Sequence, residues 1–244
     1  MALLRTDRST ATMGAGYVSQ TANTITCASF TPSANALLCV IFHEFTNDTT
    51  PSLVVTDTFT GTGAWSYIDS TANDATNWYV TRFAYAKAGS SPGTGTITCT
   101  RRASATPFTM VMVGDFFDIT GQDLTTPIRQ SNTGTSVGTT LAVSLASACA
   151  STSMTFTGVT SDNTASPTVP TSYTQRNSFG IPATAVYGVG AEMTATPTNT
   201  ISWSALGSYH AAAWAVEIQQ ATAAAFIARS GLLVRQGVQR ASVR

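Results

Sequence analysis

The sequence predicts an all-β protein, and three observations support this prediction. Hydrophobic stretches alternate with turns rich in Gly, Pro, Asn and Asp, and almost none shows the helical period of about 3.6 residues. Several stretches have little polar alternation, so both of their faces need cover. A chain of 244 residues can also bury a real core within one large β-domain. We therefore expect a single jelly-roll-like antiparallel β-sandwich, built from two related halves and flanked by N- and C-terminal arms.

The first half is expected to span residues 21–120. Before it, residues 1–20 carry mixed charge, Gly14 and Gly16, and are predicted to form an arm that is flexible or ordered by a partner. The stretch Ala36–Phe45 is too continuously hydrophobic for a half-exposed strand, so we predict that it lies centrally in a sheet. Further strands are expected at Thr24–Phe30, Leu53–Thr58, Trp65–Asp69, Trp78–Ala88, Thr96–Arg101 and Phe108–Ile119.

The second half, residues 138–220, repeats the order and chemistry of these elements at low identity. Tyr209–Ile218 matches Phe108–Ile119, and Thr198–Trp203 matches G-T-I-T-C with Trp203 in the position of Cys99. Each half alone has a small core, so one domain is favoured over two, with Gly121–Gly138 as the connector. The remaining matching strands are expected at Leu141–Leu145, Met154–Val159, Ser172–Arg176 and Ala185–Met193.

Charge and hydropathy narrow the classes of function. Only 10% of the residues are charged, far below the roughly 25% of an average domain, and such a neutral, hydroxyl-rich surface suits secreted β-proteins and subunits of large assemblies. The formal net charge is zero, so we expect no nucleic-acid binding by the sandwich body. Leu3 and Leu4 are followed at once by charged residues, which predicts no signal peptide. No stretch approaches the ~20 apolar residues of a membrane span, so we expect a soluble chain made in the cytoplasm.

The four cysteines are expected to be small buried hydrophobic residues. Cys27, Cys39, Cys99 and Cys149 show no C-x-x-C spacing, and unpaired cysteine is among the most buried residue types. The strings T-I-T-C that end in Cys27 and Cys99 leave a second interpretation open. A disulfide would join these two cysteines if their strands were neighbours, although a reducing compartment disfavours it.

No catalytic motif stands out. Gly89–Gly93 (G-S-S-P-G) formally matches a nucleophile elbow, but a strand follows it where that motif needs a helix, so it is predicted to be a hairpin turn. His43 and Glu44 are adjacent on an expected strand and would point to opposite faces, which does not suit a zinc site with His210. We predict a protein that is not an enzyme, with no catalytic residue.

Three aspartates near the midpoint raise the question of calcium. Asp115, Asp118 and Asp123 cluster around glycines, but their spacing fits no EF-hand loop, and turn or edge roles are commoner for aspartate. The acids mostly occupy turns and offer no pair for glycoside hydrolysis. We therefore predict no metal and no cofactor.

A glycan-binding platform is the alternative functional hypothesis. Trp65, Tyr67, Trp78 and Tyr79 are aromatic residues on neighbouring expected strands, and such rings can stack against sugars. Their period-two spacing fits the core of a sandwich at least as well.

The last segment, residues 221–244, differs from the rest in being rich in Ala, Leu and Arg. Its large apolar side chains would each forgo about 1.5–3 kcal/mol if they stayed in water, so we expect an arm that docks on a neighbouring subunit. A strand or helix folded back on its own domain, or a segment without fixed structure, are the alternatives. The docking residues are predicted to be Phe226, Ile227, Arg229, Leu232, Leu233, Arg235 and Arg240.

The segment Phe116–Ile128 (F-F-D-I-T-G-Q-D-L-T-T-P-I) carries the one family resemblance. It resembles a mid-domain feature of duplicated jelly-roll-like β-sandwich modules in tailed-phage virion proteins and bacterial surface proteins, and the layout extends over about residues 20–218. The resemblance implies a structural or binding role and no catalytic residues, and the Arg/Leu-rich tail departs from it. We therefore expect a virion component, either a capsid decoration or cement protein or a tail-associated protein. Its expected partners are copies of itself, other virion proteins and, in the alternative, a host-surface glycan.

Overall fold

The computed structural model describes ten segments of the chain, and all structural statements refer to them. Within these segments every regular element is a β-strand and every strand pair is antiparallel, which confirms the predicted all-β sandwich class. They contain no helix with the length and hydrophobicity that a bilayer span requires. The segments are residues 2–13, 19–20, 24–47, 53–74, 76–101, 108–163, 165–181, 186–193, 198–206 and 210–222.

The first half forms one large and one small sheet. The large sheet has the order β1-β9-β4-β7-β6, with β2 also paired to β9, and the small outer sheet has the order β3-β8-β5. The bounds of these strands are β1 Leu4–Met13, β2 Ser19–Gln20, β3 Thr24–Thr26, β4 Leu37–Thr46, β5 Leu53–Asp57, β6 Ser66–Asn73, β7 Trp78–Lys87, β8 Ile97–Arg101 and β9 Phe108–Thr120.

The second half has the same order of strands in its large sheet, and its outer sheet has one strand fewer than that of the first half. Its large sheet has the order β10-β16-β12-β14-β13, which corresponds position by position to that of the first half, and β11 and β15 form its outer sheet. The bounds of these strands are β10 Ile128–Ser136, β11 Thr140–Ser144, β12 Met154–Asp162, β13 Thr174–Ile181, β14 Val186–Met193, β15 Thr200–Ser204 and β16 Ala211–Ile218.

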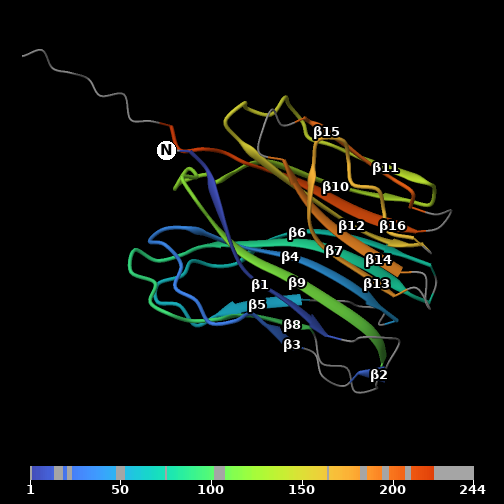
Figure 1. The fold of residues 1–244 in the computed structure, drawn as a ribbon, viewed down its shortest axis with the longest axis horizontal. Coiled ribbons are helices and arrows are strands. Elements are labelled where there is room, and N and C mark those ends of the chain that lie inside the picture. Colours follow the sequence, from blue (N-terminus) through green and yellow to red (C-terminus); the bar gives the residue numbers. More distant parts are fainter. Residues whose placement is uncertain are drawn as a thin grey trace, which may run out of the picture.

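The sheets stack in four layers, as Figure 1 shows from β11 and β15 at the top to β3 at the bottom. The two large sheets face each other in the middle, with β10 and β16 over β6 and with β13 over β9. This corrects the expectation of one two-sheet sandwich, because no strand pair in the described residues joins the halves and each half builds its own two sheets. Duplication of a half and the description as a jelly roll remain predictions.

Three hydrophobic clusters fill the spaces between the four layers. One lies between the small and large sheets of the first half, one between the two large sheets, and one inside the second half. Strand β4 contacts the first two clusters and is buried along its whole length, which confirms its predicted central place. Burial of each large side chain in such a cluster contributes about 1.5–3 kcal/mol.

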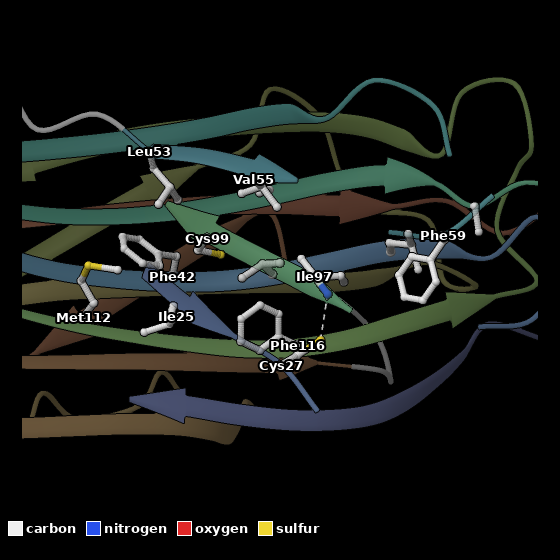
Figure 2. Packing of buried hydrophobic residues seen from close by; sticks show 14 residues of the cluster. Ile25, Cys27, Phe42, Leu53, Val55, Phe59, Ile97, Cys99, Met112 and Phe116 are labelled. Carbon is white, nitrogen blue, oxygen red and sulfur yellow. Dashed lines mark hydrogen bonds between the residues drawn. The ribbon is translucent and has the colours of Figure 1, made fainter. Parts of the chain in front are cut away.

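Three of the four cysteines, Cys27, Cys39 and Cys99, are buried as the sequence predicted, whereas Cys149 is only partly buried. Cys27 and Cys99 lie in the first-half cluster between Ile25, Ile97 and Phe116 (Figure 2), and both are free, so the alternative disulfide is absent. The Cys27 Sγ atom accepts a hydrogen bond of 3.0 Å from the backbone N–H of Ile97. Burial raises the pKa of the Cys99 thiol, which keeps it protonated and unreactive.

Two segments predicted as irregular are strands. Leu4–Met13 belongs to the expected N-terminal arm but forms β1 along β9, and half of the expected connector Gly121–Gly138 forms β10 along β16. Both are polar edge strands that cover little apolar surface, so hydrophobic periodicity does not reveal them. Their main-chain pairing and their arginine side chains hold them in place.

Candidate functional site

In the described part of the chain, charge is concentrated in internal ion pairs. Each arginine in the described residues pairs with an aspartate or glutamate, and several of the partners are fully buried. The most buried pair joins Arg101 of β8 to Glu44 of β4, and both side chains are 0% exposed. Removing one partner from such a pair would strand the other charge in the core, at a cost of about 3–5 kcal/mol.

Three of these pairs coincide with β-bulges on edge strands. The register shifts once each in β1, β10 and β13, and in every case the extra residue is an arginine that bonds a carboxylate of the neighbouring strand. A bulge twists an edge strand and interrupts the row of free backbone groups that would otherwise pair with another chain. The three pairs are Arg8 with Asp118, Arg129 with Glu217, and Arg176 with Glu192.

Arg5 of β1 connects the two halves. Its guanidinium donates to Asp115 of β9 at 2.8 Å and to Glu192 of β14 at 2.9 Å. The same group lies 3.9 Å from the centre of the Phe117 ring, which adds a cation–π contact. Because burial disfavours the charged carboxylate, the pKa of Asp115 is raised even though Arg5 opposes the shift. The arginine therefore has a structural role between the large sheets.

A second polar group lies between the large sheets, around His43 of β4. The Nδ1 atom of His43 is 3.1 Å from the hydroxyls of both Thr160 and Thr81, and Trp214 donates to Thr81 at 2.8 Å. Burial lowers the pKa of His43 to about 3, although a hydrogen bond with Asn177 opposes this shift. The imidazole is therefore neutral at physiological pH and serves as an interior hydrogen-bonding group.

The most site-like cluster lies at one end of the junction between the halves. Tyr79 of β7 donates to Asp74 at 2.8 Å and also hydrogen-bonds Asp162 at the end of β12. The ring of His210 stacks on Tyr79 with centroids 6.4 Å apart and an angle of 4°. The backbone carbonyl of His210 accepts from the N–H of Asp162 at 3.0 Å, which fixes the histidine. Two carboxylates, a phenol and an imidazole thus meet here.

The two carboxylates of this cluster differ in protonation behaviour. Desolvation favours the neutral form of Asp74, but hydrogen bonds from Asn77, Tyr79 and Thr76 outweigh it and lower the pKa. At Asp162 desolvation prevails, aided by the charge of Asp74, and raises the pKa. A phenol has a single proton to donate, so only Asp74 or Asp162 receives it at a time. Different environments for two carboxyls are typical of acid–base sites but also of structural networks.

A cavity of about 480 Å³ adjoins this cluster. Its walls come from the end of β6 in the first half, from the end of β10 in the second half, and from His210, which precedes β16. Both halves therefore contribute to it. The lining residues are Thr71, Ala72, Asn73, Thr135, Ser136, Val137 and His210.

Two of the four residues predicted as a glycan platform pack against the edge of the small sheet of the first half. Tyr67 of β6 is 38% exposed, and its hydroxyl accepts from the Val55 N–H of β5 at 3.0 Å. Trp65 packs against the first-half cluster and donates from Nε1 to Asp57 at 2.9 Å. These two aromatic residues cover the edge of the small sheet.

The other two residues lie elsewhere, so the four form no common surface. Tyr79 is 1% exposed, faces the junction between the halves and is committed to Asp74. Trp78 neighbours it on the opposite face of β7, whereas Tyr67 pairs with Ala84 toward the other end of that strand. A sugar-stacking platform of the four side chains is therefore not present.

The remaining candidates from the sequence occupy structural positions. Asp115 and Asp118 point to opposite faces of β9, toward Arg5 and Arg8, and Asp123 caps a turn by accepting from Thr125 and Thr126. They do not converge, and no group of three or more potential metal ligands occurs in the described residues.

The structure also shows the predicted turn at Gly89–Gly93 and the side-chain directions of His43 and Glu44. Gly89–Gly93 lies between β7 and β8, and Gly93 has a φ of +68°, as expected for a turn. His43 and Glu44 point to opposite faces of β4, as predicted, because one bonds Thr160 and the other pairs with Arg101.

The predicted docking residues of the C-terminal arm lie outside the described part of the chain. The last described residues are Ala221 and Thr222, and Ala221 lines a second cavity of about 490 Å³. That cavity is lined mainly by small and apolar residues, among them Ala34, Ala36 and Leu124. Leu124 is 52% exposed there.

Comparison with known proteins adds no family. Nothing matches the chain among protein-family models, curated proteins or solved structures. Any functional conclusion therefore depends on the chemistry of the residues described above.

Proposed function

We propose that this protein is a non-enzymatic structural component of a virion, a capsid decoration or cement protein or a tail-associated protein. In this role it acts through contacts between subunits. The proposal keeps the expectation from the sequence and rests on one structural observation, the internal placement of charge.

The charge distribution supports a surface that is buried in contacts with other subunits. The exposed charged residues in the described part are Asp7, Asp69, Lys87, Arg129 and Arg176, and all but Lys87 belong to an internal ion pair. The rest of the exposed surface is mostly Thr, Ser, Ala and Asn. Charge depletion is a property of surfaces buried in protein interfaces, whereas a free monomer normally relies on surface charge for solubility.

The β-bulges on the edge strands of the large sheets support assembly through specific contacts, without uncontrolled pairing of edge strands. Three of the four edges of the large sheets carry an ion-paired arginine bulge, which hinders uncontrolled strand addition. A subunit present at high local concentration needs such protection. Docking would then be left to dedicated segments such as the C-terminal arm, whose first residue, Ala221, lines the cavity at Leu124.

The test is the composition of purified particles. If the chain is a virion component, quantitative mass spectrometry of gradient-purified particles will find it at a fixed copy number relative to the major capsid protein. A chain ending at Thr222 will be made and folded but depleted from the particles. Absence of the full-length chain from particles, together with a monomeric purified protein, would overturn the proposal.

A further inference from the structure

The cavity beside Tyr79 and His210 has the features of a binding site. We propose that it binds one unit of a neutral saccharide, with ligand hydroxyls bonded to side chains from both halves. None of the four aromatic residues considered as a stacking platform lines this cavity, although Tyr79 lies behind His210. The proposal does not depend on the structural role in a virion.

The polar walls of the cavity have free hydrogen-bonding capacity. Thr71 and Asn73 of β6 and Thr135 of β10 line it, and none of these three side chains hydrogen-bonds another described residue. The hydroxyls and the amide each supply donors and acceptors. They stand on paired β-strands, so a ligand would find them already positioned, which lowers the entropic cost of binding.

The histidine adds a fixed polar group. His210 lines the cavity, its ring is held against Tyr79, and its backbone is bonded to Asp162. Because its ring and its backbone are both held, the histidine is an ordered part of the cavity wall, which lowers the entropic cost of binding.

The charges around the cavity select the ligand class. The hydroxyls and the amide that line it carry no charge, and the two carboxylates behind the histidine disfavour an anion. Asp74 already accepts hydrogen bonds from Thr76, Asn77 and Tyr79, so it does not require a cationic partner. A hydroxyl-rich neutral molecule fits these conditions best.

The volume of the cavity and its apolar lining residues fit a sugar ring. A volume of about 480 Å³ falls within the range of roughly 300–1,000 Å³ of small-molecule sites. Ala72 and Val137 complete the lining, and the 70% exposure of Val137 provides apolar area for the C–H face of a pyranose.

The experiment uses the full chain and a defined panel of probes. Saturation-transfer NMR and calorimetry would be run with glucose, galactose, mannose and N-acetylglucosamine and their disaccharides. Galacturonate would serve as the anionic probe and glucosamine as the cationic probe. We expect at least one neutral sugar to bind at millimolar concentration and galacturonate to bind less well.

Two matched variants locate the site. Thr135→Val removes a hydroxyl from the cavity, and Thr133→Val makes the same change two residues earlier on β10, outside the cavity. Both side chains are exposed, so neither change should affect folding. Loss of a ligand hydrogen bond should weaken binding about tenfold in Thr135→Val and leave Thr133→Val unchanged.

Three outcomes would overturn the proposal: no neutral sugar binds the wild-type chain, both variants weaken binding equally, or galacturonate or glucosamine binds best. Failure here would leave the particle-composition test unaffected, because that test does not involve this cavity.

Discussion

The two halves have the same strand order but fill their cores in opposite ways. At matched positions of an outer and a large sheet, the first half has Cys99 on β8 and Phe116 on β9, whereas the second half has Trp203 on β15 and Ala215 on β16. A small residue faces a large one in each case, with the sizes exchanged. The same sandwich can therefore be filled from either of its two sheets, provided that the total volume is kept.

The difference continues where the halves meet. The second half has Gly158 and Gly190 side by side on β12 and β14, and the first half has Ile41 and Phe83 at the matched positions. A Cβ on Gly158 would lie 2.8 Å from the Trp214 ring, and one on Gly190 would lie 3.0 Å from Ile41. Gly158 thus makes room for the ring of Trp214, which contacts Phe83 and donates to Thr81 of the first half. Gly190 makes room for Asn177 of its own half and for Ile41 of the first half.

Truncation of Trp203 should have the largest effect on stability, because this side chain fills the core of the second half. Trp203 is 0% exposed and donates to Thr157 at 3.1 Å, so Trp203→Ala should leave a large cavity that the alanines of β16 cannot fill. We expect a loss of about 3–5 kcal/mol in the free energy of unfolding, measured by urea denaturation.

The matched control is the same position in the other half. Cys99→Ala removes one sulfur atom and should cost on the order of 1 kcal/mol. Equal losses in the two variants would contradict the opposite filling of the cores.

A side chain at Gly158 tests the fit between the halves. Gly158→Val should displace Trp214 and cost about 1–3 kcal/mol through overpacking. Gly138→Val lies in a turn where the nearest atom is a serine hydroxyl at 3.6 Å, and it serves as the control. A destabilised control with an unaffected Gly158→Val would show that the large sheets do not meet as described.

His43 and Thr160 are matched residues of the two halves that touch each other, and they predict a pH effect. Because the folded-state pKa of His43 is lowered to about 3, the unfolded chain takes up a proton first as the pH falls below about 6.5. The contribution of neutral His43 to the free energy of unfolding is full above pH 6.5. It declines by up to about 1.4 kcal/mol per pH unit as the pH falls below that value.

Urea denaturation at pH 7, 6 and 5 measures this slope. The wild-type chain should lose more stability than His43→Gln over the interval, since glutamine does not titrate. Parallel curves for the two proteins would mean that His43 is not buried in the neutral form.

Strand positions were largely predictable from the sequence, whereas long-range partners were not. The buried stretch at β4 and the match between β9 and β16 follow from hydrophobic pattern and order. Strand β1 was missed because its sequence, L-R-T-D-R-S-T, has no apolar period and is held by Arg5 and Arg8. Ion pairs between residues about a hundred positions apart leave no local signal.

The candidate site was missed for the same reason. Asp74, Tyr79, Asp162 and His210 come from separate parts of the chain and meet only because β7, β12 and β16 converge at the junction. The local signal was the turn N-D-A-T-N, in which an aspartate precedes an asparagine by three residues, a pattern typical of a hydrogen-bonded turn. It indicated a turn and gave no indication of a cavity.

The central claim is that this chain acts through contacts between subunits, and sedimentation velocity tests it most directly. The full chain and a chain ending at Thr222 would be compared at equal concentrations, with thermal unfolding as a check on the fold. We predict that the full chain sediments as an oligomer and the shortened chain as a folded monomer. A full chain that remains monomeric at high concentration, or a shortened chain that still forms the oligomer, would contradict the docking role of residues 223–244.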